Sequence, residues 1–392
     1  MPHAIHIAFL TMDGGHNTAL HQAVRAIKDD YNVEIHLSLH STSHLRDPHE
    51  WERLERDLEQ ADFIFGGMLF GEEYVRPLER ILDRLEKTNP EVPKLFITSN
   101  PALIYRTKIG KLSLAQANDD EEQGVFKRWM QKLRPKKKGR AEGNRQTSFI
   151  RNLTRLMKYI PGMMRDLHTF IAAHDFWLHS SPENLSRFLC LLIDRYVPGY
   201  HGQLPVKEAL QYPDLAIYHP DAPQSFDNIA DYRAWRKSEG LPIANGKAGA
   251  FNGSVGLLTM RAIILSGNTD HLDALIRDIE AQGIEARAAY SALMDFRPAI
   301  TAFMQGGDSH DDLPRVDVLL NSMGFPLVGG PAGSQPDLAI EKLGAIDVPY
   351  FDMIPLGFQR VEDWQADDVG LNPMQVAMNI ALPELDGSSE PV

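Results

Sequence analysis

The stretch NSMGFPLVGGPAGSQPDLAIEKLGAI, Asn321–Ile346, indicates the fold more directly than any other part of the sequence. It starts at the end of an apolar run over 316–322, passes through a loop rich in glycine, and continues into a helical pattern over 337–343. A strand that leads through glycines into a helix is typical of α/β proteins, in which ligands bind at the carboxyl ends of the strands. The stretch therefore predicts a fold class and also the sheet edge at which a site is expected.

The sequence on both sides of this stretch repeats the alternation of strand and helix. Strands are predicted over 254–260, 284–290, 316–322 and 348–354. A helical pattern covers 268–283, with Asn268 as the expected N-cap and Gly283 as the residue at which the helix stops. Strands separated by helices of this length predict a parallel sheet with helices on its faces, here a domain over 253–387.

The N-terminal part of the chain has the same organisation. Apolar runs predict strands over 6–12, 33–39, 62–70 and 94–100. Helical patterns lie between them, and one of these helices is expected to start with Asp47 as N-cap and Pro48 at the first helical position. This part is therefore predicted to be a first α/β domain over 1–125.

The middle of the chain differs from both ends. Residues 127–145 hold nine lysines and arginines and one acidic residue, so 126–146 is predicted to be a solvated basic loop or, alternatively, a docking site for an acidic partner. Apolar spacing predicts a helical segment over 147–199, and a stretch rich in proline and tyrosine predicts an extended connector over 200–252. The predicted fold class is therefore α/β, with two doubly wound parallel-sheet domains joined by a helical segment and an extended connector.

Composition excludes several classes of protein. The formal net charge of −13 argues against binding to nucleic acid or to anionic membranes. Cys190 is the only cysteine, so no intramolecular disulfide forms, and its apolar neighbours predict a buried small hydrophobe. No apolar run approaches the ~18 residues of a membrane span, and no signal peptide precedes the first strand pattern, so a cytoplasmic location is expected.

Motifs for bound cofactors and metals are scarce. The turn MDGGHNTA, Met12–Ala19, lacks the third glycine of a dinucleotide fingerprint and the lysine of a P-loop, so a tight strand-to-helix turn is favoured over a phosphate site. The histidines form no zinc motif, and DSHDD, Asp308–Asp312, lacks the spacing of a calcium loop. Neither a metal site nor a bound cofactor is predicted for this chain.

Two interpretations of the glycine-rich loop remain open. Glycines let the backbone approach a ligand closely, and the apolar neighbours Phe325, Leu327 and Phe358 suit a planar ring. Pro331 removes one N–H group, which argues against a phosphate cradle. Alternatively, the glycines only permit tight packing of the strand against the helix.

Several motifs, in order along the chain, resemble one family. They are RTKIGKLSLAQ (106–116), FWLHSSPENLSRFLCLLIDRYVPGY (176–200), YPDLAIYHPDAP (212–223), SVGLLTMRAIILSGNTDHLDALIRDIEAQG (254–283), FRPAITAF (296–303), MGFPLVGGPAG (323–333), DVPYFDMIPLGFQ (347–359) and ALPELDG (381–387). Together they are similar to the large H subunit of magnesium chelatase, a relative of the cobalt-chelatase large subunits, and the bacteriochlorophyll-pathway form is the closer likeness. The resemblance covers about Ile5 to Gly387.

The resemblance implies an activity carried out by a complex. The large H subunit binds protoporphyrin IX and is the place where Mg²⁺ is inserted, both as substrates, while two ATPase-type partners, the I and D subunits, hydrolyse ATP. Family members continue beyond the match to PELDG, so this chain is expected to be the N-terminal portion, with its second domain truncated on the C-terminal side. The main catalytic groups are expected beyond Val392, and the chain alone is expected to be inactive.

The resemblance and the position of the strand ends also imply a substrate-binding surface. Its expected members are Arg261, Asn268, His271, Ser322, Gly329, Gly330 and Gln359. Arg261 is expected to pair with a propionate, and Asn268 and His271 lie near a predicted helix N-terminus, which favours an anion. Three alternatives stay open: a non-catalytic tetrapyrrole-binding or regulatory protein, a cobalt-chelatase relative, and a two-domain module that binds another small molecule.

Overall fold

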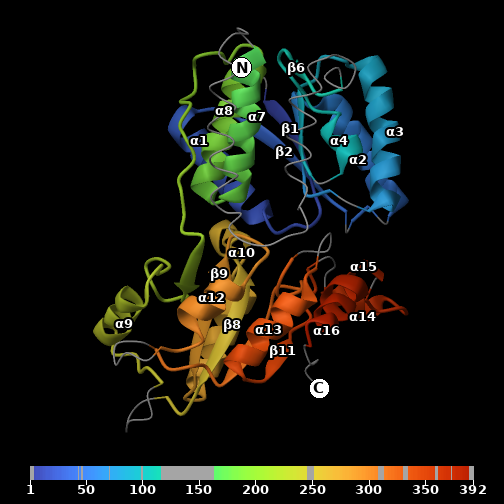
Figure 1. Cartoon of the computed structure of the whole chain (residues 1–392). Helices are drawn as coiled ribbons and strands as arrows, with labels where there is room; N and C mark the ends of the chain where they lie inside the picture. The colour runs from blue at the N-terminus through green and yellow to red at the C-terminus, as the bar shows by residue number, and fades with distance from the viewer. Residues whose placement is uncertain are drawn as a thin grey trace. The chain divides into compact units, whose positions relative to one another are not determined.

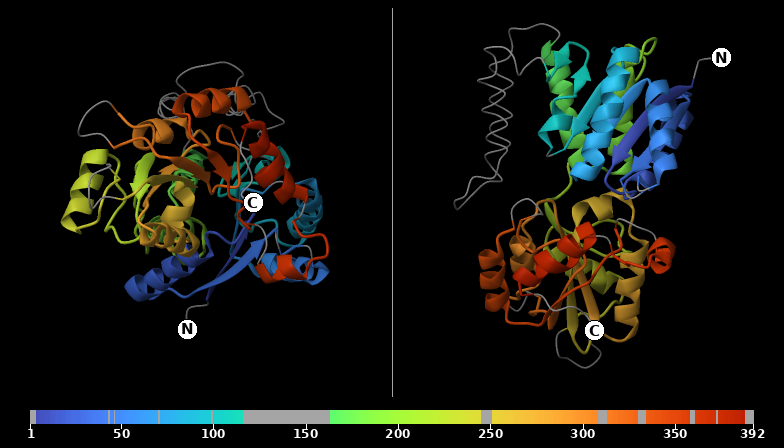
Figure 2. Two further views of the ribbon diagram at one scale, coloured as in Figure 1. Left: turned by 90° about the horizontal axis from the view of Figure 1, so that it is seen from below. Right: turned by 90° about the vertical axis from the view of Figure 1, so that its right-hand side faces the viewer.

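The computed structural model of this chain describes residues 4–42, 44–45, 47–69, 71–98, 100–115, 163–244, 251–307, 313–329, 334–357, 361–371 and 373–387. The chain divides into two units, Met1–Leu210 and Gln211–Val392, each with its own sheet and core (Figures 1 and 2). The predicted basic loop and the DSHDD motif lie outside the described residues. The two interpretations of the basic loop therefore stay predictions.

The first unit is built on a six-stranded sheet with the order β2-β1-β3-β4-β5-β6. The strands are β1 (Ile5–Thr11), β2 (Ile35–Ser41), β3 (Phe63–Gly67), β4 (Lys94–Ile97), β5 (Lys108–Ile109) and β6 (Leu112–Ser113). The first four run parallel, and β5 and β6 form an antiparallel hairpin at the edge. Because β2 and β3 lie on opposite sides of β1, the sheet is doubly wound.

Helices cover both faces of this sheet (Figure 1). On one face lie α1 (Asn17–Tyr31), α7 (Met163–Leu178) and α8 (Pro182–Tyr196), and on the other lie α2 (Pro48–Gln60), α3 (Glu72–Thr88) and α4 (Pro101–Ile104). Successive side chains of a strand point to opposite faces. Accordingly, Phe63 and Phe65 of β3 pack in the core with Phe188 of α8, whereas Ile64 packs in the opposite core with Leu82 of α3. The predicted helical segment thus contributes two helices to the core of the first unit.

A buried carboxylate joins α7 to the edge hairpin of the first unit. Asp166 is 1% exposed, and its Oδ2 accepts a hydrogen bond from the backbone N–H of Lys111 at 2.7 Å. Tyr196 of α8 donates its hydroxyl to Oδ1 of the same carboxylate at 3.1 Å. Gly110 has a φ of +55°, and a Cβ there would lie 2.4 Å from Asp166, so only glycine fits this turn. One side chain therefore connects three elements.

The second unit is built on a five-stranded sheet with the order β11-β10-β8-β9-β7. The strands are β7 (Leu215–Tyr218), β8 (Ser254–Met260), β9 (Glu285–Ser291), β10 (Val318–Asn321) and β11 (Tyr350–Asp352). All run parallel except β7, which pairs antiparallel with β9 at the edge. Since β9 and β10 flank β8, this sheet also reverses its winding at β8, and the predicted α/β class with two doubly wound, mainly parallel sheets is confirmed.

Helices and short helical turns complete the second unit. They are α9 (Ile229–Ser238), α10 (Arg261–Ser266), α11 (Asp270–Ala281), α12 (Arg297–Phe303), α13 (Pro336–Ile346), α14 (Val361–Ala366), α15 (Pro373–Val376), the π-helix η2 (Ala377–Ala381) and α16 (Leu382–Leu385). Leu272 and Ile276 of α11 pack on one face of the sheet beside Leu257. Phe303 of α12 and Ile346 of α13 pack on the other, beside Leu319.

An ion network fixes α9 at the amino end of β9. Arg236 donates to Glu280 at 2.8 Å and to the hydroxyl of Tyr232 at 3.0 Å. Arg287 donates to Glu285 at 3.1 Å, and Arg236, Arg287 and Glu285 are all fully buried. Two arginines and two glutamates balance in charge, as buried ions require. The network lies at the amino end of β9, away from the carboxyl edge of the sheet. It therefore stabilises the fold and does not contribute to the carboxyl edge.

Two local predictions differ from the structure. The N-cap of α11 is Thr269, and Asn268 instead lies in the turn that closes α10, directly after its C-cap Gly267. Gly267 has a left-handed conformation, and its N–H and that of Asn268 bond to the carbonyls of Ile264 and Ile263, which is the Schellman arrangement. The stretch 200–252 also contains β7 and α9, which are too short for apolar periodicity to reveal them.

Two predictions from composition can be compared with the structure. Cys190 is buried, as predicted, and burial raises the pKa of its thiol to about 11. Within the described parts of the chain, no helix is both long enough and apolar enough to span a membrane.

Candidate functional site

The carboxyl edge of the second sheet gathers most of the predicted substrate-binding residues. The winding reverses between β8 and β10, and the loops that follow these two strands diverge there. Ser322 lies at this point: its backbone N–H and its hydroxyl both donate to the carbonyl of Leu258, at 3.0 and 2.8 Å. Ser322 therefore ties the end of β10 to β8 at the position where an α/β sheet opens a crevice.

Arg261 follows β8 directly and begins α10. Its guanidinium group is 4% exposed and donates to the carboxylate of Asp214 at 3.0 Å and to the carbonyls of Tyr212 and Pro213, both at 3.3 Å. It thereby holds the segment that leads into β7. Its predicted pairing with a propionate stays a prediction, and such a propionate would compete with Asp214 for the same cation.

Asn268 and His271 lie at the start of α11, and both side chains are exposed. The first N–H groups of a helix have no partner within it, and the helix dipole adds partial positive charge there. Asp270 and Asp273 also lie in this first turn, so their carboxylates counter the partial positive charge there. Their role in holding a ligand stays a prediction.

The glycine-rich loop is fixed along its first half. Gly329 has a φ of +81°, and Val328 forms a β-bridge with Asp295 in the loop after β9. Leu327 belongs to the hydrophobic core and is fully buried, so its side chain does not face a ligand. Gly330, Gln359 and Phe358 lie outside the described residues, and their predicted roles stay predictions.

Buried polar side chains from the last helices reach this edge, and no prediction from sequence assigned them a role. Asp386, 1% exposed at the end of α16, accepts from the backbone N–H of Leu327 at 2.6 Å. Burial raises the pKa of its carboxyl group to about 6. Burial, followed by the negative charges of Asp352 and Asp386, raises the pKa of the Tyr350 hydroxyl. Asp352 and Asp386 therefore lie near Tyr350 beside β10 and β11.

Asn379 of η2 holds the loop after β11 in a similar way. It is 1% exposed, and its amide donates to the carbonyl of Pro355 at 2.8 Å. Asp386 belongs to the ALPELDG motif, whereas Asn379 belongs to none of the motifs found in the sequence. A short local motif gives no indication that this carboxylate turns back onto a loop 59 positions earlier.

The MDGGHNTA turn of the first unit is a packed turn. The N–H of Gly15 donates to Asp13 at 2.8 Å, and the N–H of Asn17 donates to the carbonyl of Gly14 at 3.0 Å. His16 stacks on Trp177 with ring centroids 4.4 Å apart, and its Nε2 lies 3.0 Å from the hydroxyl of Ser180. Burial lowers the pKa of His16, so the ring is neutral at pH 7. The turn thus serves to pack α7 against β1.

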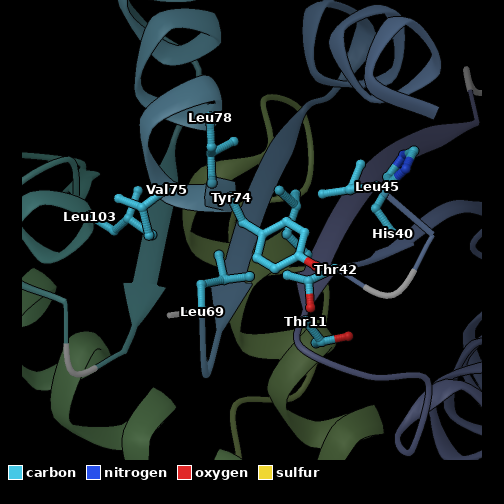
Figure 3. Close-up of a pocket in the computed structure, with 10 residues that line it drawn as sticks. Thr11, His40, Thr42, Leu45, Leu69, Tyr74, Val75, Leu78 and Leu103 are labelled. Atoms are coloured by element: carbon cyan, nitrogen blue, oxygen red, sulfur yellow. The ribbon is translucent and has the colours of Figure 1, made fainter. Parts of the chain in front are cut away.

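A small cavity lies on the other face of the first sheet (Figure 3). Its volume is about 10 Å³, which is the space that one water molecule needs. Six aliphatic side chains line it, together with those of Thr11, His40, Thr42 and Tyr74. A cavity of this size holds no organic ligand. Among the residues that the structure describes, no group of three or more His, Cys, Asp or Glu side chains is placed to hold a metal ion.

Comparisons with known proteins agree with the motifs. The family model described as CobN/Magnesium Chelatase matches residues 174–392, and the one described as a domain of unknown function (DUF3479) matches residues 6–171. The magnesium-chelatase H subunit of Rhodobacter capsulatus is 29% identical over 393 residues, covering 100% of this chain and 31% of the relative. The corresponding H subunit of Cereibacter sphaeroides is 30% identical over 391 residues, covering 98% of this chain and 30% of the relative.

A cobalt enzyme is also among the relatives. The aerobic cobaltochelatase CobN subunit of Sinorhizobium sp is 33% identical over 155 residues, covering 38% of this chain and 11% of the relative. The chain spans about a third or less of the length of these relatives. The CobN/Magnesium Chelatase model covers more than half of the chain. This chain therefore belongs to the CobN/magnesium chelatase family.

Proposed function

We propose that this chain is the N-terminal portion of a porphyrin-binding magnesium-chelatase subunit. In this role it contributes to the insertion of Mg²⁺ into protoporphyrin IX during chlorophyll or bacteriochlorophyll biosynthesis. The observation that carries the proposal is the match to the magnesium-chelatase H subunit along 100% of the chain. The complex forms nitrogen–metal bonds, and its ATPase-type I and D subunits hydrolyse the ATP.

The contribution of this chain is binding rather than metal insertion. It spans 31% of the length of the R. capsulatus relative, so most of that protein has no counterpart here. The main catalytic groups belong to the part of the relatives that this chain does not span.

The tetrapyrrole-facing surface is proposed at the carboxyl edge of the second sheet. A porphyrin is a planar apolar ring that carries anionic propionates. The exposed start of α11 carries Asn268 and His271, whose side chains can donate hydrogen bonds to a propionate. Arg261, at the end of β8, would exchange its bond to Asp214 for one to a second propionate. Ser322 and Gly329 belong to the loop over which the ring would lie.

Porphyrin titration tests this proposal. A soluble deuteroporphyrin is added to the whole chain, and quenching of tryptophan fluorescence gives the affinity. Arg261→Ala is expected to weaken binding by roughly 1.5–3 kcal/mol, because a charged hydrogen bond to a propionate is lost. Gly330→Val is expected to block the surface sterically.

Controls separate binding from folding. Arg261 also holds two backbone carbonyls, so circular dichroism must show that each variant is folded. His271→Ala removes an exposed side chain without touching the core and is expected to weaken binding while leaving the melting temperature unchanged. If all three variants are folded and bind with unchanged affinity, the porphyrin is held elsewhere.

A cobalt chelatase is the second candidate, and the 33% identity to CobN over 155 residues favours it. The two candidates share a tetrapyrrole ligand and differ in the metal. A complex reconstituted with the ATPase subunits and the remainder of the large subunit would insert Mg²⁺ under the first proposal and Co²⁺ under the second. Tetrapyrrole binding without insertion of either metal would favour a non-catalytic binding protein.

A further inference from the structure

The last helices of the second unit contact both loops that flank the proposed binding surface. Asp386 of α16 accepts from Leu327 N–H at 2.6 Å, in the loop that follows β10. Asn379 of η2 donates to the carbonyl of Pro355 at 2.8 Å, in the loop that follows β11. The first of these loops runs on into Gly329, which is a member of the predicted surface. One helical segment therefore holds both loops.

Gly324 lies where the two loops and η2 meet. A Cβ at this position would lie 2.9 Å from Oδ1 of Asn379 and 2.9 Å from Cγ of Pro355. Its φ of +69° is a further reason for glycine, since other residues rarely adopt it. The backbone of the first loop is thus pressed against the side chain that holds the second. Movement of one loop must displace the other.

Asp386 is an unusual residue for a contact with the buried backbone N–H of Leu327. Its side chain is 1% exposed, and Oδ1 has no hydrogen-bond partner among the described residues. A buried carboxylate that makes one hydrogen bond costs free energy, whereas an apolar residue in its place would not. The hydrogen bond satisfies the backbone N–H of Leu327, which would otherwise be a buried donor without an acceptor. The position of Leu327 is therefore held at the expense of stability.

We infer that Asp386 is a positioning residue for the tetrapyrrole-facing surface, and that with Asn379 it holds the loops after β10 and β11 in their binding arrangement. This inference rests on the proposed function. Asp386 does not itself touch the ligand: it acts through the backbone of Leu327. The edge of the sheet is thereby preorganised by a segment that lies 59 residues further along the chain.

Hydrogen exchange and porphyrin binding, measured on the whole chain, test the two halves of the inference. In Asp386→Ala the Leu327 amide is expected to exchange about tenfold faster or more, because a charged hydrogen bond is lost. The amide of Ser322, bonded to Leu258 within the sheet, serves as the internal control and is expected to be unchanged. The Kd for deuteroporphyrin, measured from the shift of its Soret band, is expected to rise by about fivefold or more.

Conservative and neighbouring substitutions complete the design. Asp386→Asn keeps a carbonyl oxygen as acceptor and is expected to restore both readouts to nearly wild-type values. Leu385→Ala changes a neighbouring side chain that is 56% exposed, and no effect is expected. If Asp386→Ala does not fold, Asn379→Ala provides the same test, with peptides around Pro355 reporting the exchange.

The outcomes separate this inference from the proposed function. Faster exchange at Leu327 with an unchanged Kd would overturn the positioning role and leave porphyrin binding intact. Unchanged exchange would show that Asp386 does not hold the loop. If the wild-type chain gives no Soret shift, the proposed function fails, and the inference fails with it, even if the exchange results are as expected.

Discussion

At the scale of single residues, the carboxyl edge of the second sheet is notable for buried ionisable groups. Asp386 and Tyr350 are both displaced from their ordinary pKa in the direction that burial produces. Such groups concentrate at sites that function requires, although ion networks within the core shift pKa values as well. The network of Arg236 and Glu280 is of the second kind, because its charges are paired. The carboxyl group of Asp386 has no cationic partner within the described residues, which sets it apart.

The stability of the chain is expected to depend on the protonation of Asp386. Its folded-state pKa of about 6 lies above the ordinary value, so the folded state binds the proton more tightly than the unfolded state. The resulting stabilisation is complete below about pH 4 and is lost as the pH rises through about 6. Asp386→Asn should remove this dependence, which amounts to about 1–2 kcal/mol between about pH 4 and pH 7.5.

Urea unfolding at several pH values measures this effect. The quantity of interest is the difference in unfolding free energy between wild type and Asp386→Asn, since other groups titrate equally in both. A difference that is independent of pH would show that Asp386 titrates normally in the folded chain.

At the scale of secondary-structure elements, strands and helices that are long enough to show a periodic pattern could be predicted from the sequence. All eight predicted strands exist, because each carries apolar residues that pack in a sheet whose two faces are covered by helices. The start of α2 is also confirmed: Asp47 is its N-cap, with Pro48 at the first position. The hairpin of β5 and β6 and the edge strand β7 were not predicted, since two to four residues are too few to show a period.

Removal of the N-cap of α2 is expected to have a measurable cost. The carboxylate of Asp47 accepts from the N–H of His49 at 2.9 Å. Asp47→Ala leaves this N–H without its acceptor and should lower the unfolding free energy by about 1 kcal/mol. Asp47→Asn retains an acceptor and should be nearly neutral. Equal loss in the two variants, measured by urea unfolding, would show that charge rather than capping stabilises the helix.

The candidate site is less predictable from sequence than the fold, because it depends on contacts between elements that are far apart in the chain. Strand ends and glycines predict the edge at which a site is expected, and Ser322 lies at that edge, directly after β10. What the side chains do there depends on contacts between distant segments. Arg261 is engaged by residues 47 to 49 positions away, and Asp386 reaches back 59 positions. No local pattern encodes such pairs.

At the scale of the whole molecule, the chain consists of two units, each with its own sheet and core. The family models divide the chain elsewhere, at about residues 171–174, within α7. Because α7 and α8 pack in the core of the first unit, the structural boundary lies later, after Leu210. Domain boundaries derived from sequence families and from packing thus differ by about one helical hairpin.

This difference leads to a prediction about fragments. A fragment that ends at Leu210 is expected to fold, because it includes α7 and α8 with Phe170, Phe176 and Phe188. A fragment that ends at residue 171 loses Phe176, Phe188 and the whole of α8 from this core and should not give a cooperative thermal transition. Far-UV circular dichroism during heating distinguishes the two. Cooperative melting of the shorter fragment would show that α8 is dispensable.

The contact between Gly110 and Asp166 has a consequence for how this protein family can vary in evolution. A Cβ at position 110 would lie 2.4 Å from the Asp166 carboxylate, and the backbone there has a φ of +55°. A larger residue at position 110 therefore requires a smaller one at position 166 and a different turn as well. Because single changes at either position are costly, we expect the two residues to be inherited together.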